Sequence, residues 1–242
     1  MEPFATAPWG ARGAPHMTLS STIGLAALSL LALAACEPHV SGNGVLGQAG
    51  CDAGLFDTAK IGLGMTATLT VDATKSASTC VISGDENLIQ HIQVLHTGNT
   101  VETHTDLASF DHVLPLELRI TTPVLVKVET QPGKSGETTR VVVNGAATQD
   151  FTVVEQGPSS VWLSGAGGST LTADLSAGSM LDARDYLVGS AQVALTGGSS
   201  LHVETAGAIT GSAADNSVIL VHGGGSCSVT RTNGATCGAA PP

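Results

Sequence analysis

The second half of the chain repeats a short glycine pattern, and this repetition limits the available folds more than any other feature of the sequence. Residues 167–171 read Gly-Gly-Ser-Thr-Leu, residues 197–201 read Gly-Gly-Ser-Ser-Leu, and residues 224–227 give an imperfect third copy, Gly-Gly-Ser-Cys. The copies begin 30 and 27 residues apart. Self-similarity at a period of roughly 20–50 residues is typical of stacked structural repeats.

Short segments that alternate between apolar and polar residues lie between the glycines, as expected of brief β-strands. They cover residues 171–175, 193–196, 201–205, 218–221 and 227–230. Such strands, separated by glycine turns, predict a β-solenoid over residues 161–237 with about three short strands in each coil. A loose tail, residues 238–242, would follow the last coil.

Large aromatic rings are scarce, which favours a thin solenoid over a globular sandwich. After residue 36 the Phe, Tyr and Trp residues are Phe56, Phe110, Phe151, Trp162 and Tyr186. A sandwich core usually contains more such rings, whereas valine, leucine and isoleucine can fill stacked coils. Disorder is the alternative, since glycine, serine and alanine are abundant after residue 161. The regular spacing of leucine and valine favours ordered coils.

The preceding part, residues 56–160, is also rich in strand signals. Strand-like runs cover residues 66–71, 116–121, 124–129 and 140–143, and most of them alternate in polarity. Turn signals lie between them at Asn43-Gly44, Gly84-Asp85, Pro132-Gly133 and Asn144-Gly145. No amphipathic helix of ten or more residues follows residue 36. We therefore predict an all-β chain.

The N-terminus has the pattern of an export signal. Residues 22–35 are apolar and uncharged, but they are too short to span a bilayer, which takes about 20 apolar residues. They end in Leu33-Ala34-Ala35-Cys36, which has the form of a lipobox. We predict a lipoprotein signal peptide over residues 1–35, lipidation of Cys36, and a segment over residues 36–55 that leads into the β domain. An ordinary secretory signal and a start at Met17 stay open as alternatives.

A lipid-anchored, exported chain would lie in a bacterial cell envelope, in the periplasm or at the cell surface, with the outer membrane favoured. The formal net charge is −11, and removing the signal peptide with Arg12 and Glu2 leaves this charge unchanged. An acidic surface repels phosphate backbones. We therefore expect the membrane as a partner through the lipid, together with a cell-envelope glycan or a surface protein, and no nucleic acid.

Four further cysteines, Cys51, Cys80, Cys227 and Cys237, follow Cys36. An even number of cysteines in an exported chain predicts two disulfides. Three pairings are possible, and Cys51–Cys80 with Cys227–Cys237 closes the shortest loops. No two of these cysteines have the close spacing of a structural zinc site.

A set of weak motifs occurs in a characteristic order. They are Val-Ser-Gly-Asn-Gly-Val at 40–45, a Phe-Asp strand at 56–61, Gly-Asp-Glu-Asn-Leu-Ile at 84–89, a strand ending before proline at 118–123, and degenerate Leu-Ser-Gly turns at 163–167 and 195–198. Over roughly residues 40–230 this order resembles the family of putative auto-transporter adhesins known as the head GIN domain. The resemblance implies a right-handed parallel β-helix-like fold on a bacterial lipoprotein or surface protein.

These features together favour a lipid-anchored, non-enzymatic protein that acts by adhesion or ligand binding through a flat solenoid face. A carbohydrate-active β-helix enzyme, such as a polysaccharide lyase or hydrolase, is the alternative. Two or three carboxylates that converge in a groove would favour the enzyme. A smooth face of serine, threonine and valine would favour binding.

An enzyme of that kind needs acids, or acids with bases, grouped on one face. The candidates in the repeats are Asp174, Asp182, Arg184 and Asp185. An extended strand would put Asp182 and Arg184 on the same face, although a surface salt bridge at a turn is the simpler interpretation. Ser164 lacks the flanking residues of a nucleophile elbow and is interpreted as a turn residue. We predict no catalytic residue and no cofactor.

A run of histidines is the remaining candidate for chemistry. It contains His91, His96, His104 and His112, with Glu102, Asp106 and Asp111 nearby. Imidazole and carboxylate groups are ligands for zinc, copper or nickel. We interpret this region as a solvated polar edge and predict no metal, with a weak metal site at the four histidines as the alternative.

Overall fold

The structure of the protein is a computed structural model that describes residues 39–133, 136–146 and 150–241. These residues belong to one compact unit, Glu37–Pro242. The predicted signal peptide, the lipobox and the lipidation site Cys36 lie outside the described residues. Over the described ranges, no helix has the length and apolar character needed to cross a bilayer.

The described part of the chain is all-β, as the sequence predicts. It contains a large mixed sheet, a small sheet that pairs β1 with β8, and the short helix α1 (Glu86–Ile89). The strands before residue 160 are β1 (His39–Ser41), β2 (Leu46–Cys51), β3 (Thr58–Ile61), β4 (Thr66–Val71), β5 (Thr79–Asp85), β6 (Ile92–Thr97), β7 (Thr100–Thr105), β8 (Ser109–Asp111), β9 (Glu117–Thr122), β10 (Lys127–Thr130), β11 (Thr139–Ala146), β12 (Asp150–Glu155) and β13 (Ser159–Gly165). The later strands are β14 (Gly168–Leu175), β15 (Met180–Leu195), β16 (Ser200–Thr205), β17 (Ala208–Ala213), β18 (Val218–His222), β19 (Ser226–Arg231) and β20 (Thr236–Ala239).

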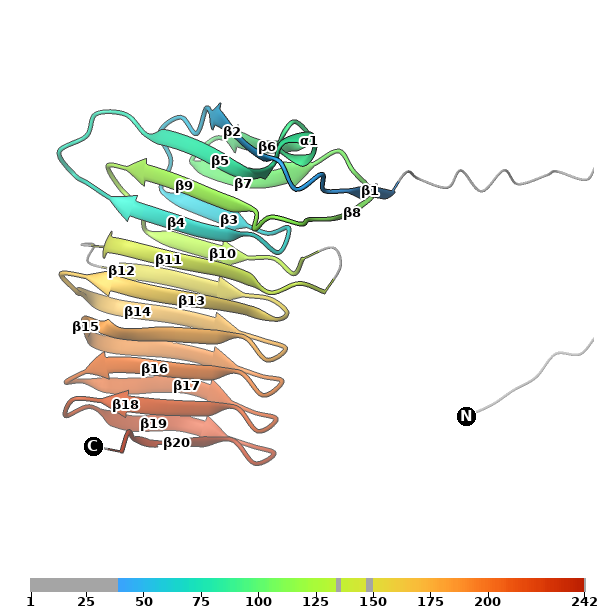
Figure 1. The fold of residues 1–242 in the computed structure, drawn as a ribbon. Coiled ribbons are helices and arrows are strands. Elements are labelled where there is room, and N and C mark those ends of the chain that lie inside the picture. The colour runs from blue at the N-terminus through green and yellow to red at the C-terminus, as the bar shows by residue number, and fades with distance from the viewer. Residues whose placement is uncertain (1–38, 134–135, 147–149, 242) are drawn as a thin grey trace, which may run out of the picture. The chain divides into compact units, whose positions relative to one another are not determined.

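Parallel pairing between every second strand winds the chain into stacked coils (Figure 1). β11 pairs with β13, and β13 with the first part of β15. β12 pairs with β14, and β14 with the last part of β15. Two layers result, and β15 contributes to both. The β13 layer contains β9, β4, β11, β13, the start of β15, β16, β18 and β20, and the β14 layer contains β3, β10, β12, β14, the end of β15, β17 and β19.

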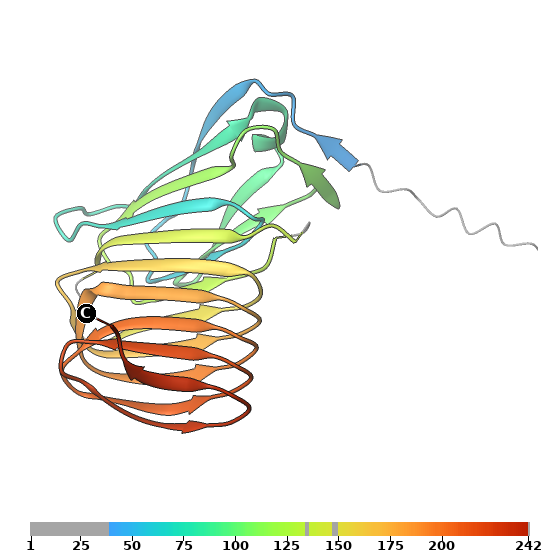
Figure 2. The same ribbon diagram turned by 60° about the horizontal axis from the view of Figure 1, so that its bottom comes forward.

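Each coil contains two strands, so the prediction of three strands per coil is wrong. Ser160 pairs with Met180 and Met180 with Ser200, which gives a coil of 20 residues, and the next step, from Ser200 to Val218, takes 18. The glycine copies are therefore one and a half coils apart. They precede β14 and β16, which lie in opposite layers, so the copies mark strand starts on alternating layers and not successive coils. Figure 2 shows the stacked turns of the chain with the C-terminal end brought forward.

Strand alternation places every second side chain between the two layers. In β13, Val161 and Leu163 are buried, whereas Ser160, Trp162 and Ser164, which alternate with them, face outward. The rings of Phe151 and Tyr186 meet edge to face in this interior, with their centroids 6.0 Å apart. Because each buried aliphatic or aromatic side chain contributes about 1.5–3 kcal/mol, these inward rows hold the coils together.

The N-terminal end adds antiparallel strands to the stack. β5 pairs antiparallel with both β2 and β9, and β6 pairs antiparallel with β7. The parallel pairings of β11 with β13 and of β12 with β14 then cross residue 160. The same sheet therefore continues through the point at which the composition of the sequence changes.

Both predicted disulfides are present, in the pairing that closes the shortest loops. Cys51 is bonded to Cys80, and these two residues face each other across the antiparallel pair β2 and β5. Cys227 is bonded to Cys237 and joins β19 to β20 in the last coil. The second bridge thus ties together the two layers at the end of the stack.

Two of the predicted turns lie inside strands. Asn144 and Gly145 fall within β11, where the register to β13 shifts and forms a bulge. Gly145 has φ of 77°, and a Cβ there would lie 2.7 Å from the carbonyl oxygen of Val71, so the bulge requires glycine. Gly84 and Asp85 end β5, because hydrogen bonds from distant backbone groups fix the Asp85 carboxylate there.

One carboxyl group, that of Glu155, lies inside the stack. The residue is 1% exposed, and Ser159 donates a hydrogen bond of 2.9 Å to its Oε2. Among the described residues, Oε1 has no hydrogen-bond partner. Burial raises the pKa of Glu155 to about 8, although the hydrogen bond from Ser159 acts in the opposite direction. The group is therefore mostly protonated at neutral pH.

Replacing Glu155 by glutamine should make the protein less sensitive to alkaline pH. Because folding raises the pKa from 4.5 to about 8, the wild type loses stability as the pH rises through this window. Glutamine stays neutral, so the stability of Glu155→Gln relative to wild type should grow by roughly 3–4 kcal/mol between about pH 5 and pH 9. Urea unfolding at both pH values measures this change. An equal difference at the two values would contradict the raised pKa.

Candidate functional site

The outer face of the β13 layer carries Trp162, the only Phe, Tyr or Trp ring of the described residues that is not buried. Phe56, Phe110, Phe151 and Tyr186 are at most 2% exposed. Trp162 lies between Val161 and Leu163, which both point inward, so the alternation of β13 turns the indole outward, where it is partly exposed. A large ring in this position is available for contact with a ligand.

Trp162 lines a depression of about 320 Å³ that crosses three neighbouring strands. In the register of the sheet, Val142 of β11 and Asp182 of β15 lie on either side of Trp162. The other lining residues are Asn144, Leu163, Ser164, Arg184 and Asp185. The depression therefore combines one flat apolar ring with a rim of hydrogen-bonding groups.

Asp182 and Arg184 form an ion pair in this depression. They lie two residues apart on β15, as the sequence predicts for one face of a strand, and Nε of Arg184 donates to Oδ1 of Asp182 at 2.9 Å. Nη2 of Arg184 donates to Oδ2. The hydrogen bonds from Arg184 hold the pKa of Asp182 below its ordinary value, although partial burial acts the other way. The carboxylate is therefore ionised and fixed in orientation.

This ionised state limits the chemistry of the site. Glycoside hydrolysis needs one carboxylic acid that stays protonated until it transfers its proton to the leaving oxygen. Asp182, with a lowered pKa and a bound guanidinium, is a poor donor of that kind. The arrangement is suited to hydrogen bonding of a ligand, because the pair offers both an acceptor and a donor.

Ser164 lies in β13, so its interpretation as a turn residue is wrong. Its hydroxyl donates a hydrogen bond of 3.1 Å to the carbonyl oxygen of Val143 and lies 3.3 Å from Oδ1 of Asn144. The register shift that forms the bulge in β11 brings these two strands into that contact. Ser164 thereby helps to position the Asn144 amide beside Trp162.

Two histidines continue the same face on the next coils. His202 of β16 is in register with Asp182, and the ring of His222 from β18 stacks on it with centroids 5.6 Å apart. Partial burial lowers the pKa of His202, and Arg184 and His222 act in the same direction against Asp182. The His202 ring is therefore mostly neutral at neutral pH.

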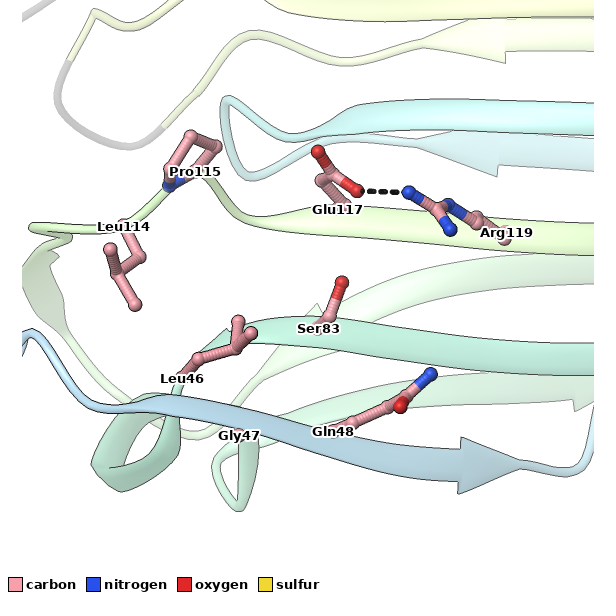
Figure 3. Close-up of a pocket in the computed structure, with 8 residues that line it drawn as sticks. All are labelled: Leu46, Gly47, Gln48, Ser83, Leu114, Pro115, Glu117 and Arg119. Atoms are coloured by element: carbon pink, nitrogen blue, oxygen red, sulfur yellow. Dashed lines mark hydrogen bonds and ion pairs between the residues drawn. The ribbon is translucent and has the colours of Figure 1, made fainter.

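A second depression, of about 340 Å³, lies at the N-terminal end of the layer (Figure 3). Its lining residues are Leu46, Gly47, Gln48, Ser83, Leu114, Pro115, Glu117 and Arg119. Nη2 of Arg119 lies 2.8 Å from Oε2 of Glu117, its ion-pair partner two residues away on β9. Arg119 is in register with Thr68, and Thr68 with Val142. The two depressions therefore lie on one continuous face.

The structure brings three of the four predicted acid–base candidates together and separates the fourth. Asp182, Arg184 and Asp185 all line the depression at Trp162. Asp174 lies on the outer face of β14, in register with Ala194, and so belongs to the opposite layer. The core between the layers keeps it away from the other three.

Three of the four histidines that stood as weak metal candidates have separate partners. His91 lies 2.9 Å from Asp106, His96 lies 2.9 Å from the carbonyl oxygen of Leu55, and His112 lies 3.2 Å from Glu137. His104 is exposed on β7. In the part of the chain that the structure describes, no group of three or more His, Cys, Asp or Glu side chains is placed to hold a metal ion.

The sequence contains a local signal for the outward position of Trp162. Residues 160–164 read Ser-Val-Trp-Leu-Ser, which alternates with Trp162 on the polar side. That position predicts an outward-facing ring. The association of Trp162 with Asn144 and Asp182 could not be predicted, because it depends on a coil of 20 residues.

Comparison with known proteins identifies a family. The model of the family described as putative auto-transporter adhesin, head GIN domain, matches residues 56–225. No curated protein matches the chain.

Several solved structures share the fold at low sequence identity. A putative adhesin from Bacteroides fragilis is 15% identical, with a TM-score of 0.61, and the match covers 81% of this chain and 96% of that one. A putative lipid binding protein from Parabacteroides distasonis is 12% identical, with a TM-score of 0.53 and coverage of 84% and 98%. A putative adhesin from the same species is 13% identical, with a TM-score of 0.51 and coverage of 82% and 98%.

Proposed function

Because the chain belongs to the head GIN domain family of putative auto-transporter adhesins, we propose that it is a lipid-anchored, non-enzymatic adhesin of the bacterial cell envelope. In this proposal Cys36 holds the protein at the membrane and the β domain binds a ligand in the periplasm or at the cell surface, with the outer membrane favoured. The ligand is a cell-envelope glycan or a surface protein. Nucleic acid is not a partner, because the net charge of the chain is −11.

The proposed architecture of the binding part is a right-handed parallel β-solenoid. The parallel pairing of every second strand and the two-strand coils support it. A stack of this kind offers flat outer faces on which side chains from successive coils line up, because the register repeats along the sheet. Such a face suits adhesion, since it can contact a large ligand at several points.

The observation that carries the binding proposal is the position of Trp162. Tryptophan, tyrosine and arginine dominate the energetics of binding surfaces, and the chain exposes its one described tryptophan beside the pair Asp182 and Arg184. Val161 and Leu163 fill the core, so the alternation of β13 leaves the indole on the outer face, where a ligand can reach it. A large apolar ring that stays partly exposed among polar groups supports a binding role.

Replacing Trp162 by alanine should abolish most of the binding to whole cells or envelope fragments of the source bacterium. Loss of a central aromatic contact typically costs about 2–4 kcal/mol of binding free energy, which corresponds to a roughly 30- to 1000-fold weaker affinity. The unit Glu37–Pro242, which is compact by itself, serves as the protein in a sedimentation assay. Leu55→Ala is the matched control, because Leu55 is a large exposed apolar residue (56% exposed) outside the depression. Equal loss in both variants, or none in Trp162→Ala, would contradict the proposal.

The membrane anchor has its own test. Expression of the full chain should give a protein that fractionates with membranes and carries an acylated N-terminal peptide in mass spectrometry. Cys36→Ser should remove the acyl groups, because a thiol is required for the thioether link, and should change the fractionation. A Cys36→Ser protein that is processed and retained at the membrane as in wild type would refute the anchor and would leave the binding face untouched.

The alternative function is a carbohydrate-active enzyme, and the meeting of Asp182 and Asp185 in one depression is the observation that favours it. The lowered pKa of Asp182 counts against an acid catalyst. Incubation of the unit with a bound polysaccharide decides between the two functions. Release of reducing ends or of unsaturated sugars that Asp182→Asn abolishes would establish the enzyme.

A further inference from the structure

We infer that the ligand of the β13 layer is an uncharged, extended glycan that lies across the strands, with one sugar ring stacked on Trp162. This inference rests on the proposed function, because it names the ligand class of the same face. It is carried by three features of the described residues. They are the exposed indole, the two ion pairs Asp182–Arg184 and Glu117–Arg119, which we call acid–arginine clamps, and the alignment of all three along one sheet.

The indole supplies a platform that fits a pyranose ring. The face of an aromatic ring carries partial negative charge, and the C–H groups on one side of a pyranose carry partial positive charge. Stacking therefore favours a flat sugar, while the hydroxyl groups at the sugar's edge reach outward. Around Trp162 those hydroxyls meet the Asn144 amide and the Asp182–Arg184 pair. Few, well-placed polar groups around an apolar surface are typical of small-molecule sites.

The same clamp occurs twice on this face. Asp182 and Arg184 are two residues apart on β15, and Glu117 and Arg119 are two residues apart on β9. Each pair presents a carboxylate acceptor and guanidinium donors, which matches a sugar hydroxyl that both donates and accepts. Arg184 holds Asp182 through two nitrogens, whereas the more exposed Arg119 makes one hydrogen bond to Glu117. Glu117 and Arg119 line the second depression with Gln48 and Ser83, as Figure 3 shows.

The distance between Arg119 and Trp162 indicates the length of the ligand. From Arg119 the register runs through Thr68 and Val142 to Trp162, which is three steps between neighbouring strands. At about 4.8 Å for each step, this distance is about 14 Å. A disaccharide on Trp162 would not reach Arg119, whereas a linear oligosaccharide of several sugars would contact both depressions.

The charges of the two depressions argue against an acidic glycan, although Arg140 of β11 adds a positive charge to the same face outside both depressions. In the Trp162 depression, Asp182 and Asp185 outnumber Arg184, and the second depression pairs Glu117 with Arg119. No arginine or lysine among these lining residues lacks a neighbouring carboxylate. Uronates, sulfates and phosphates would therefore meet net negative charge, and their binding would be opposed at low salt. A neutral sugar meets no such penalty.

The first test asks whether the ligand is a glycan. Envelope fragments that bind the unit Glu37–Pro242 are divided and treated with periodate, which cleaves vicinal diols of sugars, or with a broad protease. A glycan ligand predicts loss of at least nine-tenths of the Trp162-dependent binding after periodate and full retention after protease. Loss after protease alone would overturn the glycan inference. Binding that still depends on Trp162 would in that case leave the proposed adhesin function standing.

The second test asks whether the glycan is neutral and extended. Trp162 is the only tryptophan of the unit, because the other tryptophan of the chain is Trp9, so its fluorescence reports stacking directly. Oligosaccharides released from the envelope fragments are separated into neutral and acidic fractions and sized. Neutral chains of six sugars should shift the emission and protect it from acrylamide, and disaccharides should bind at least tenfold more weakly.

Variants separate the contributions of the two depressions. Arg119→Ala should weaken the six-sugar fraction about tenfold and leave the disaccharide unchanged, and Trp162→Phe should retain part of the affinity that Trp162→Ala loses. Leu55→Ala should bind as wild type. Preferential binding of the acidic fraction, or equal affinity for long and short chains, would overturn the inference. Circular dichroism of each variant establishes that the fold is intact.

Discussion

Replacing Asp85 by alanine is expected to lower the free energy of unfolding by roughly 3–5 kcal/mol. Asp85 is 1% exposed, and its carboxylate accepts three backbone hydrogen bonds. Gly44 donates to Oδ1 at 2.7 Å, and Val113 and Leu114 donate to Oδ2 at 2.8 and 3.0 Å. Removal of the carboxylate leaves these three donors without their acceptor.

The size of this effect follows from what Asp85 holds together. The residue ends β5, while Gly44 precedes β2 and Val113 follows β8, so one side chain joins three segments that are distant in sequence. Burial alone would raise the pKa of Asp85, but the three N–H donors more than offset it, and the pKa lies below its ordinary value. The stability from this group is therefore present above the ordinary carboxyl range and is lost as the pH falls.

The matched control is Asp106→Ala. Asp106 is an exposed carboxylate that pairs with His91 at 2.9 Å, and exposed ion pairs contribute about 0–1 kcal/mol. Urea unfolding of wild type, Asp85→Ala and Asp106→Ala at neutral pH measures the difference. If the two variants were equally stable, the three hydrogen bonds would not hold the segments as described. The free energy of unfolding of Asp85→Asn should lie between those of wild type and Asp85→Ala, because asparagine keeps one acceptor oxygen.

Replacing Gly167 by alanine is the second change with a large expected effect, a loss of roughly 3–5 kcal/mol in the free energy of unfolding. Gly167 has φ of 88°, in the region that residues with a Cβ rarely adopt. A Cβ there would also lie 2.2 Å from the carbonyl oxygen of Leu187, in the bent middle of β15. Backbone strain and a collision with a neighbouring coil therefore add to each other.

Gly178 separates these two causes. It has φ of 78°, but a Cβ there would meet no atom within 4 Å. Gly178→Ala should therefore show the backbone strain alone, about 1–2 kcal/mol. Thermal and urea unfolding of both variants give the comparison. A loss in Gly178→Ala as large as that in Gly167→Ala would mean that the close packing of coils at Gly167 has no energetic weight.

The structure gives a physical meaning to two motifs that carried the family resemblance. The family match confirms the resemblance over residues 56–225, and the motif at residues 40–45 lies before this range. Residues 40–45 and residues 84–89 bind each other. Asn43 donates its backbone N–H to Oδ1 of Asn87, and the Asn87 amide donates to the carbonyl oxygen of Ser41. A Cβ at Gly42 would lie 2.3 Å from the Asp85 carboxylate. The glycine of one motif and the acid of the other are thus parts of one contact between distant segments. In the sequence they are two separate patterns.

The predicted turn at Gly84-Asp85 failed for the same reason. Glycine followed by aspartate is a common turn pair because aspartate readily bonds to nearby backbone groups. Here the Asp85 carboxylate bonds to groups 28–41 residues away, and the pair continues β5 instead. The hydrogen bonds of Asp85 to distant segments therefore outweigh the local preference of Gly-Asp for a turn, and a local pattern cannot predict them.

The sequence by itself determined that the chain is all-β and which cysteines could pair economically. These properties depend on the alternation along single strands and on the spacing of residues along the chain, so they are local. The need for glycine at Gly42, Gly145 and Gly167 was decided by contacts with distant groups. Only the tertiary structure decided that a coil takes two strands. The alternation of Ser-Val-Trp-Leu-Ser is compatible with a coil of any length. Interstrand hydrogen bonds form between backbone groups that nearly all residues share, so the sequence does not specify which strands pair. The choice of a 20-residue coil placed Asp182 beside Trp162, and with it the candidate site.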